Sequence, residues 1–437
     1  MKKMIVKIAF VFGSSVAAGA MLDLQPQIDA AAAKGGGVVR VETGDHEVKP
    51  FELKSNVTLQ LADGATILAS TNIADYATRG ECPVFIYAGH ATNVAIVGKG
   101  TIDGRGGGFR ETAKLRGEDQ PKTLPLLMRF SRCRNVRLEG FHYTNPGSWA
   151  CHLRNCDGVT VKGTSCFNYC NRMNDGLDIE SCNVTVEDCD FYADDDSFCF
   201  KAESDKTFPV TNVVVRNCRM GSICNAIKFG TGSYCDFRDI TIENCELRRS
   251  PGAWRWDWRK AMPGVTNRYC GIAGLALEVV DGGRMENVTI RNITMEGYMT
   301  PIFIRHHHRH EPKGGKVNTY LRNVLIENVK GSADGRIASS ITGVPAKGGA
   351  SPRRPRNITL RNISLTVPGG GTEAEAKASV PEKDGAYPEA FMFNRMALPA
   401  YGFYVRHADD VRFENVKVET ATPDARPEFY MEDCSRS

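Results

Sequence analysis

Short runs of alternating apolar and polar residues recur along most of the chain. Each run begins with Asn or Asp, continues with Val or Ile, and carries a second apolar residue two positions later. Alternation with a period of two predicts a short β-strand with one buried face, and the flanking Asn and Gly residues favour turns. The copies are Asn93–Ile96, Asn135–Leu138, Asn183–Val186, Asn212–Val215, Asp239–Ile242, Asn287–Ile290, Asn323–Ile326, Asn357–Leu360 and Asp410–Phe413.

The spacing of these copies decides the fold class. It runs from 26 residues, between Asp157 and Asn183, to 53 residues, between Asn357 and Asp410. Repeats of ~20–50 residues are typical of solenoids and related arrays. Because no helical stretches separate the strands, the pattern predicts an all-β, right-handed parallel β-helix. Its aligned Asn residues are expected to stack as hydrogen-bonded ladders in the turns.

The N-terminal part of the chain is predicted to contain a signal peptide followed by a capping helix. Leu24–Lys34 predicts a short helix that caps the open N-terminal edge, and Gly35–Gly37 ends it. Residues 1–20 combine early lysines, a short apolar run and a small-residue cleavage site, which is typical of a signal peptide. We therefore expect residues 21–437 to form a single β-helix domain that is secreted or periplasmic. Residues 366–392 are rich in Gly, Pro and Glu, and are predicted to form a surface loop.

Composition narrows the function. The 437 residues are 42% hydrophobic and 24% charged, with a formal net charge of +4. This small charge gives no case for nucleic acid as a partner, and no segment is long and apolar enough to span a membrane. The fifteen cysteines recur at repeat-like positions, so we expect mostly free, buried thiols rather than disulfides. We expect a monomer without a cofactor.

The most informative stretch is acidic. Asn174-Asp175-Gly176 precedes Asp195-Asp196 by about one coil, because Asp175 and Asp195 are 20 residues apart. Their carboxyl groups are expected to stand on adjacent coils, ~4.8 Å apart along the solenoid. Inverting glycoside hydrolysis needs a protonated carboxyl and a water-activating carboxylate ~6.5–9.5 Å apart. A solvated acidic turn and a calcium site are the alternatives, and neighbouring Asp195 and Asp196 share a cleft only at a turn or bulge.

Together with these motifs, several others resemble glycoside hydrolase family 28, which contains polygalacturonases and rhamnogalacturonan hydrolases. The matching segments are Ala30–Gly37, Leu53–Leu59, Asp63–Ala65, Gly100–Gly104, Asn145–Trp149, Met173–Asp175 and Asp195–Asp196. The resemblance covers nearly the whole chain after residue 20 and implies a pectic oligo- or polysaccharide substrate. It also implies that Asp195 is the general acid and that Asp175 and Asp196 position the attacking water, with no metal.

Two segments depart from this family. The Gly-His-Gly segment falls on Cys224-Asn225-Ala226, so Asn225 replaces His. The Arg-Ile-Lys segment, which grips a substrate carboxylate in the family, falls on Ala276-Leu277-Glu278. Glu278 would repel a uronate. Either other cations hold the carboxylate, or the sugar at that position is neutral.

Further residues are candidate substrate contacts. Lys201 and Lys228 lie close to the acidic pair in the repeat, and Arg305 and Arg309 bracket a run of histidines. Trp256 belongs to a Trp-rich loop of the kind that stacks on sugar rings. The full set of predicted substrate-binding residues is Asn174, Asp178, Lys201, Asn225, Lys228, Arg305, Arg309 and Trp256.

The sequence therefore predicts a glycoside hydrolase of the polygalacturonase type. A polysaccharide lyase on the same fold is the first alternative; it would need calcium on the acidic cluster and an Arg or Lys as base. A non-catalytic glycan-binding solenoid is the second alternative.

Overall fold

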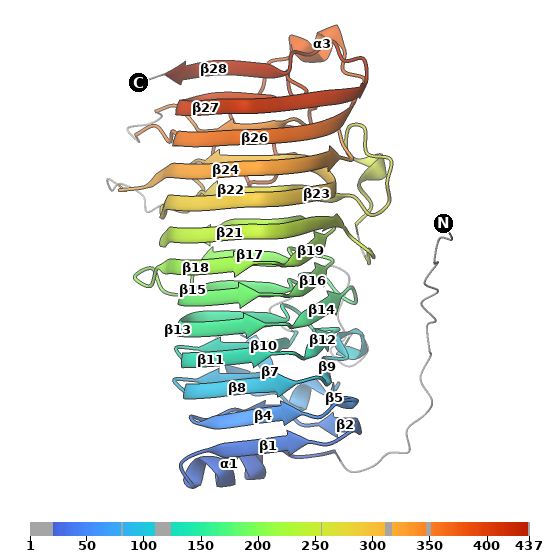
Figure 1. Ribbon diagram of the computed structural model, residues 1–437, viewed down its shortest axis with the longest axis vertical. Helices are drawn as coiled ribbons and strands as arrows, with labels where there is room; N and C mark the ends of the chain where they lie inside the picture. Colours follow the sequence, from blue (N-terminus) through green and yellow to red (C-terminus); the bar gives the residue numbers. More distant parts are fainter. Residues whose placement is uncertain are drawn as a thin grey trace.

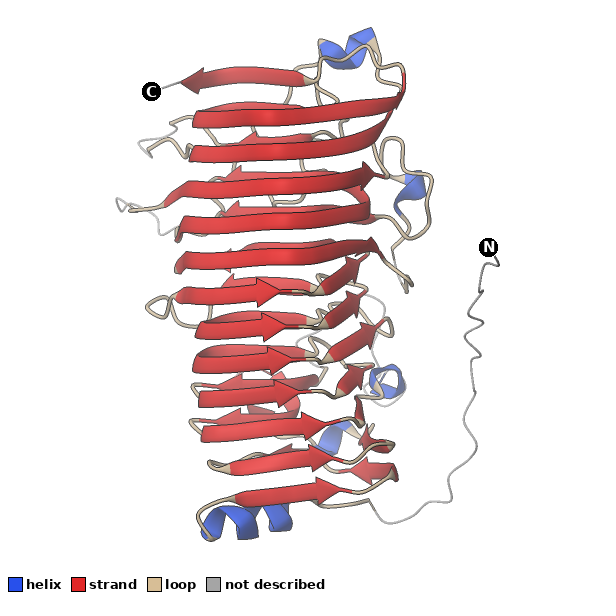
Figure 2. Ribbon diagram, viewed as in Figure 1, coloured by secondary structure: helices blue, strands red, loops and turns tan. Residues whose placement is uncertain are grey.

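The repeating apolar positions stack into a parallel β-helix, as the sequence predicts (Figure 1). The computed structural model describes residues 21–79, 82–109, 124–254, 256–310, 317–346 and 351–435. The predicted signal peptide at residues 1–20 lies outside the described residues. Strands run across the molecule in successive coils, and the coils rise along its long axis from α1 to β28 (Figure 2).

The strands form three stacks of parallel pairs, and long strands turn a corner to serve two stacks. The first stack is β1 (Gly37–Val41), β4 (Val57–Leu61), β8 (Thr92–Gly98), β11 (Arg134–Glu139), β13 (Cys151–Lys162), β15 (Leu177–Glu187), β18 (Val210–Arg216), β21 (Asp236–Arg249), β23 (Arg284–His306), β24 (Tyr320–Ala333), β26 (Arg356–Gly369) and β27 (Phe403–Thr422). The second stack is β2 (Gly44–Val48), β5 (Ala65–Ala69), β9 (Thr101–Asp103), β12 (His142–Thr144), β14 (Ser165–Asn168), β16 (Asp190–Ala193) and β19 (Arg219–Ser222), which continues into β21.

The third stack carries the candidate site and is called the site face below. It consists of β3 (Phe51–Glu52), β7 (Cys82–Gly89), β10 (Leu126–Ser131), β13, β15, β17 (Phe198–Ala202), β20 (Asn225–Ser233), β22 (Gly271–Val279), β23, β25 (Ser339–Thr342), β27 and β28 (Phe429–Ser435). The remaining elements are α1 (Gln25–Ala33), α3 (Glu373–Ala376), β6 (Thr78–Arg79) and the short helices at Ile73–Asp75, Gly106–Gly108 and Trp258–Lys260. The pairing of β6 with β7 is antiparallel.

The core is a ladder of branched apolar side chains inside the solenoid. A branched apolar residue one or two positions after each repeat Asn or Asp points inward, and register aligns these residues from coil to coil. The aligned series is Val94, Val136, Val159, Val184, Val213, Ile240, Val288, Val324, Ile358 and Val411. Each such side chain contributes ~1.5–3 kcal/mol when it leaves water, so the ladder ties every coil to its neighbours.

The predicted asparagine ladder is present. Asn93 donates to Asn56 at 2.9 Å, Asn135 donates to Asn93 at 2.7 Å, and the series continues to Asn357, which donates to Asn323 at 2.8 Å. These residues adopt positive φ, for example 55° at Asn135. Asn and Asp tolerate this left-handed conformation better than most other side chains, which explains why one of them stands at this corner in most coils.

The predicted cap and the predicted thiols are confirmed. Helix α1 lies below β1 (Figure 1) and buries Ile28 completely against the first coil. All fifteen cysteines are free thiols, and most of them are buried. Among the described residues, no helix has both the length and the apolar character that crossing a membrane requires.

The prediction of a surface loop at residues 366–392 is wrong for its second half. Residues 380–393, called the covering segment below, lie against the outside of the site face. Val380, Ala390 and Phe393 are buried there with Ala276 and Tyr404 in a second apolar cluster, outside the solenoid interior. The polar composition of the segment conceals these few apolar anchors.

Candidate active site

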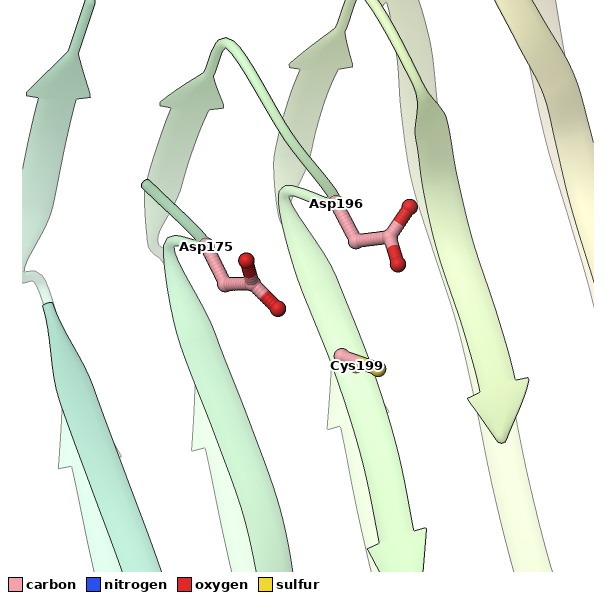
Figure 3. A group of neighbouring side chains, drawn as sticks. All are labelled: Asp175, Asp196 and Cys199. Carbon is pink, nitrogen blue, oxygen red and sulfur yellow. The ribbon is translucent and has the colours of Figure 1, made fainter. Parts of the chain in front are cut away.

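Asp175 and Asp196 occupy the same level on two adjacent coils of the site face. Asp175 precedes β15 and Asp196 precedes β17, and the two strands pair with Leu177 opposite Phe198. The two carboxylates point the same way (Figure 3), and one oxygen of each lies within 4.8 Å of the other. Gly176 permits this close approach, because a Cβ there would lie 2.4 Å from the carbonyl oxygen of Ser197.

Asp195 reaches the same cleft because the chain bends between β16 and β17. The bend spans Asp194 and Asp195, so the strict alternation of side chains does not apply there. Asp195 accepts a hydrogen bond from the backbone N–H of Asp196 at 3.0 Å. Asp175, Asp195 and Asp196 all line one cleft. The spacing in the sequence predicted that Asp195 lies level with Asp175. The register of β15 and β17 instead places Asp196 level with Asp175.

Asn174 shapes the loop that presents Asp175. It is fully buried, and its side-chain oxygen accepts hydrogen bonds from the backbone of Cys170 at 3.2 Å and of Asn171 at 2.8 Å. Its amide donates to the carbonyl of Ser148 at 3.3 Å. All of these partners are backbone groups, so Asn174 acts here as an internal brace rather than as a surface for substrate.

Lys201 supplies a positive charge beside Asp175. Its ammonium lies 3.8 Å from Asp175 and 3.7 Å from Asp178, and it sits 4.6 Å from the ring centre of Trp149. Asp178 is completely buried, and neither of its carboxylate oxygens has a hydrogen-bond partner. Lys201 lines the cleft, while Asp178 lies beneath it and acts through Lys201 and Asp175.

A second positive charge lies beside Asp196 on the next coil. The Lys228 ammonium is 3.7 Å from Asp196, 2.6 Å from Glu389 and 4.0 Å from Glu278. Asn225 donates to Asp196 through both its backbone, at 3.1 Å, and its side chain, at 2.8 Å. Lys228 and Asn225 are almost completely buried, so both orient Asp196 and neither presents a free donor to the cleft.

Two of these carboxyl groups, Asp195 and Asp175, are harder to ionise than usual. Burial raises the pKa of Asp195 to about 7, and the charge of Asp196 adds to this rise while Lys228 opposes it. Burial, followed by the charge of Asp178, raises the pKa of Asp175 well above its usual range, and Lys201 opposes that rise. Crowded carboxyl groups therefore share protons near neutral pH, and Asp195 can stay protonated there.

The cleft in front of these groups is large enough for several sugar rings. Its volume is about 780 Å³. It is lined by residues of β7, β10, β13, β17 and β20 and of the loop before β15, and its lining includes Trp149, His152, Glu203, Tyr234 and Tyr387. Three cations, Arg129, Arg154 and Lys206, line it together with Lys201. Apolar rings with a few convergent charges are typical of sugar sites.

Three predicted substrate contacts lie elsewhere. Arg305 is completely buried, and its guanidinium donates to His307, Gly343 and Glu382, so it offers no donor to a ligand in the cleft. Arg309 pairs with Asp281 at 2.8 Å behind Tyr387. Trp256 stacks on Trp258 at 4.9 Å in the apolar cluster under the covering segment. Arg305, Arg309 and Trp256 are therefore used in internal packing and ion pairing in this structure.

Among the site residues that the sequence analysis did not identify are Tyr387 and Glu389. Both come from the covering segment, more than 150 residues beyond Asn225 and Lys228. The sequence does contain one signal for such a cover, namely the almost uninterrupted apolar run Gly271–Val279. This run forms β22, and all nine of its residues are buried. A strand buried on both faces reads as a near-continuous apolar run and implies that something covers it.

One set of side chains has the spacing of a metal site. Asp175, Asp196 and the Cys199 thiol place one ligand atom each within 4.8 Å of one another, the one such group among the described residues (Figure 3). Lys201 and Lys228 already supply positive charge to the two carboxylates at 3.8 and 3.7 Å. This charge balance favours proton chemistry over a bound cation at these residues.

Comparison with known proteins agrees with this arrangement. The model of the glycosyl hydrolases family 28 matches residues 36–273. The endo-polygalacturonase of Pectobacterium carotovorum subsp. carotovorum is 23% identical over 363 residues, which cover 76% of this chain and 81% of that enzyme. A probable polygalacturonase of Vitis vinifera is 23% identical over 365 residues, covering 76% of this chain and 69% of the relative.

Solved structures share the fold at low identity. The exopolygalacturonase of Thermotoga maritima superposes with a TM-score of 0.62 at 19% identity, covering 91% of this chain and 88% of that one. The family 28 exopolygalacturonase of Yersinia enterocolitica superposes with a TM-score of 0.66 at 17% identity, covering 95% of this chain and 76% of that one. The family model spans more than half of the chain and includes Asp175, Asp195 and Asp196. The chain therefore belongs to glycosyl hydrolase family 28 and is a glycoside hydrolase.

Proposed function

We propose that the protein hydrolyses an acidic, pectin-type glycan with Asp195 as the general acid and with Asp175 and Asp196 as the groups that hold the attacking water. The observation that carries this proposal is the meeting of three carboxyl groups in one cleft, with the pKa of Asp195 raised to about 7. A carboxyl that is neutral near neutral pH can donate a proton, and one neighbouring carboxylate is enough to accept the proton of the attacking water.

The reaction would proceed in one displacement. Asp195 gives its proton to the glycosidic oxygen as the bond to the anomeric carbon breaks. Water held between Asp175 and Asp196 attacks that carbon from the opposite face and loses its proton to one of these carboxylates. The oxygens of Asp175 and Asp196 lie within 4.8 Å of each other, a span that one water can bridge by two hydrogen bonds. Solvent exchange then restores the protons, and the anomeric configuration is inverted.

The charge distribution supports an acidic substrate. Relatives of the chain are polygalacturonases by name. Arg129 and Arg154 line the cleft and also a smaller adjoining hollow, whose other residues include Arg79 and Arg132. Arginine suits carboxylates through its planar pair of donors. By contrast, Lys228 is buried against Glu389 and Glu278, so the cationic positions for uronates lie on the N-terminal side of the catalytic residues.

The proposal includes export and a monomeric state. Residues 1–20 would direct the chain out of the cytoplasm, where polymeric plant glycans are met, and residues 21–437 would act as one domain. A lyase reaction would require a cation at the acidic cluster and a free base. The lysines close to these acids, Lys201 and Lys228, are both paired with carboxylates. This pairing favours hydrolysis.

An assay of reducing-end release tests the proposal. Polygalacturonate, rhamnogalacturonan and a neutral pectic side chain are incubated with the parent and with Asp195→Asn. We expect release from an acidic glycan by the parent and none by the variant. No release from any of the three by a folded parent would overturn the proposal, and an ultraviolet-absorbing product would show a lyase instead.

A further inference from the structure

One row of outward-facing residues runs along the whole site face. Strand register connects Tyr87, Arg129, His152, Asp178, Cys199 and Lys228, and then Ala276, Phe303, Ser340 and Tyr404. The row is mostly polar or charged up to Lys228, and mostly apolar or aromatic beyond it. The change falls at one coil boundary, between β20 and β22, immediately beyond the catalytic aspartates.

The second half of this row is covered. Ala276, Phe303 and Tyr404 are completely buried, although they point away from the solenoid interior. They pack in one apolar cluster with Met392 and Phe393 of the covering segment. Substrate therefore cannot lie across β22, β23, β25 and β27 as it can across β7 to β17.

The cleft ends at the edge of the covering segment. Tyr387 is 57% exposed and is the one residue of this segment that lines the cleft. Its ring lies 5.4 Å from the Lys228 ammonium and 5.4 Å from the Arg309 guanidinium. Glu389 lies behind it, on Asn225 and Lys228. Tyr387 and Glu389 thus form a wall that stands one coil beyond Asp196.

The covering segment is anchored by buried and partly buried hydrogen bonds. Arg305 donates to the carbonyl of Glu382 at 2.8 Å, and Arg406 donates to the carbonyls of Val380 at 2.7 Å and Pro381 at 2.9 Å. His308 contacts Asp384 at 3.1 Å. Charged donors on backbone carbonyls are worth ~1.5–3 kcal/mol each, so the covering segment is a fixed part of the fold.

We propose that the substrate groove is blind at its C-terminal side, so that the enzyme cuts only near a chain end. A polymer that crosses Asp175 and Asp196 must stop at Tyr387, because no described part of the groove continues past it. The wall admits only the short terminal portion of the chain, and the longer portion extends over β13, β10 and β7. The inference rests on the proposed hydrolysis and adds where along the polymer it occurs.

Product size over time tests this inference. Polygalacturonate is digested with the parent protein while reducing ends and viscosity are followed together and early products are separated by chromatography. We expect a uniform short product from the first time point, with viscosity nearly unchanged at a few per cent of bonds cut. At equal mass, shorter chains should give proportionally higher initial rates. A ladder of oligosaccharides with a rapid fall in viscosity would overturn the inference.

A variant tests the wall itself. Tyr387→Ala removes the ring that ends the cleft, and Tyr269→Ala, at another exposed tyrosine, is the matched control. We expect longer first products from Tyr387→Ala and the parent pattern from the control. An unchanged product pattern in Tyr387→Ala would contradict the assigned role of this residue. Absence of reducing ends in the parent would instead refute hydrolysis, so the two failures are distinguishable.

Discussion

Lys228 and Glu389 form a buried ion pair, with 2.6 Å between Nζ and Oε1, although they are 161 residues apart in the sequence. The same Glu389 carboxylate accepts a hydrogen bond from Asn225 at 3.2 Å, and Asn225 donates to Asp196 at 2.8 Å. A late segment of the chain is thereby connected to Asp196, one of the two carboxylates that we propose hold the attacking water. The covering segment both ends the groove and sets the electrostatics of the site.

Replacing Glu389 with Gln should shift the pH dependence of activity. The negative charge of Glu389 helps to raise the pKa of Asp195, after burial and Asp196, and Lys228 opposes it. Glu389→Gln removes that charge and leaves Lys228 less neutralised, so the pKa of Asp195 falls. The alkaline limb of the kcat/KM profile should then move to lower pH. Glu373→Gln, on the exposed α3, is the control, and an upward or absent shift would contradict this role.

Asp195→Asn should abolish turnover and stabilise the fold. Loss of a general acid costs ~10²–10⁴-fold in kcat. Stability should change in the opposite direction, because Asn needs no proton to stay neutral at this half-buried position. In the parent, the pKa of Asp195 is about 7 when folded, against an ordinary value of 3.8. Between these pH values the folded state holds a proton that the unfolded state has released, so this group's contribution to the free energy of unfolding declines as pH rises.

Thermal unfolding at two pH values measures that effect. The midpoint of Asp195→Asn should exceed that of the parent by more at pH ~8 than at pH ~5. Asp63→Asn, at an exposed turn, should track the parent at both values. An equal stability gain at both pH values would show that Asp195 ionises normally in the folded protein and would contradict this prediction.

Arg154→Gln should weaken binding of acidic glycans. Arg154 lines both the cleft and the adjoining cationic hollow. A hydrogen bond to a charged group contributes ~1.5–3 kcal/mol, so its loss should raise KM by about tenfold or more with little change in kcat. The control is Arg40→Gln, at an exposed arginine near the N-terminal end. An equal loss with both variants, or a loss only in kcat, would argue against a binding role.

Treatment with a chelator should leave activity unchanged. Lys201 and Lys228 balance the carboxylates of Asp175 and Asp196, so the proposed chemistry needs no added cation. The measurement is reducing-end release before and after EDTA, followed by addition of calcium. Loss of activity that calcium restores would support the lyase alternative.

The solenoid was predictable because its determinants are local. Each coil repeats the same alternation, and the Asn at each corner is needed for a left-handed turn and a ladder hydrogen bond, as at Asn135 and Asn183. The placement of Asp175 and Asp196 on adjacent coils was predictable from the same regularity, because the two acidic groups are about one coil apart in the sequence. The one-residue difference in register arose from the bend at Asp194–Asp195, which periodicity does not specify.

The wall was not predictable, because it depends on a contact between distant segments. Glu389 stands in a Gly- and Glu-rich stretch that has no period, and nothing local connects it with Lys228. Arg305 was misassigned for a related reason. An arginine beside a run of histidines is expected at the surface from the sequence, whereas here its donors are used by the His307 side chain and by the carbonyls of Gly343 and Glu382. A further clue was the apolar run at Gly271–Val279, which implied a cover for that strand.

Proton NMR of the first product tests the central mechanism most directly. The parent is mixed with a glycan of known anomeric configuration, and the newly formed reducing end is observed before it mutarotates. Attack by a water held between Asp175 and Asp196, with Asp195 as the acid, predicts a saturated product of inverted configuration. A product with retained configuration, or one with an unsaturated ring, would contradict the assignment of these three residues.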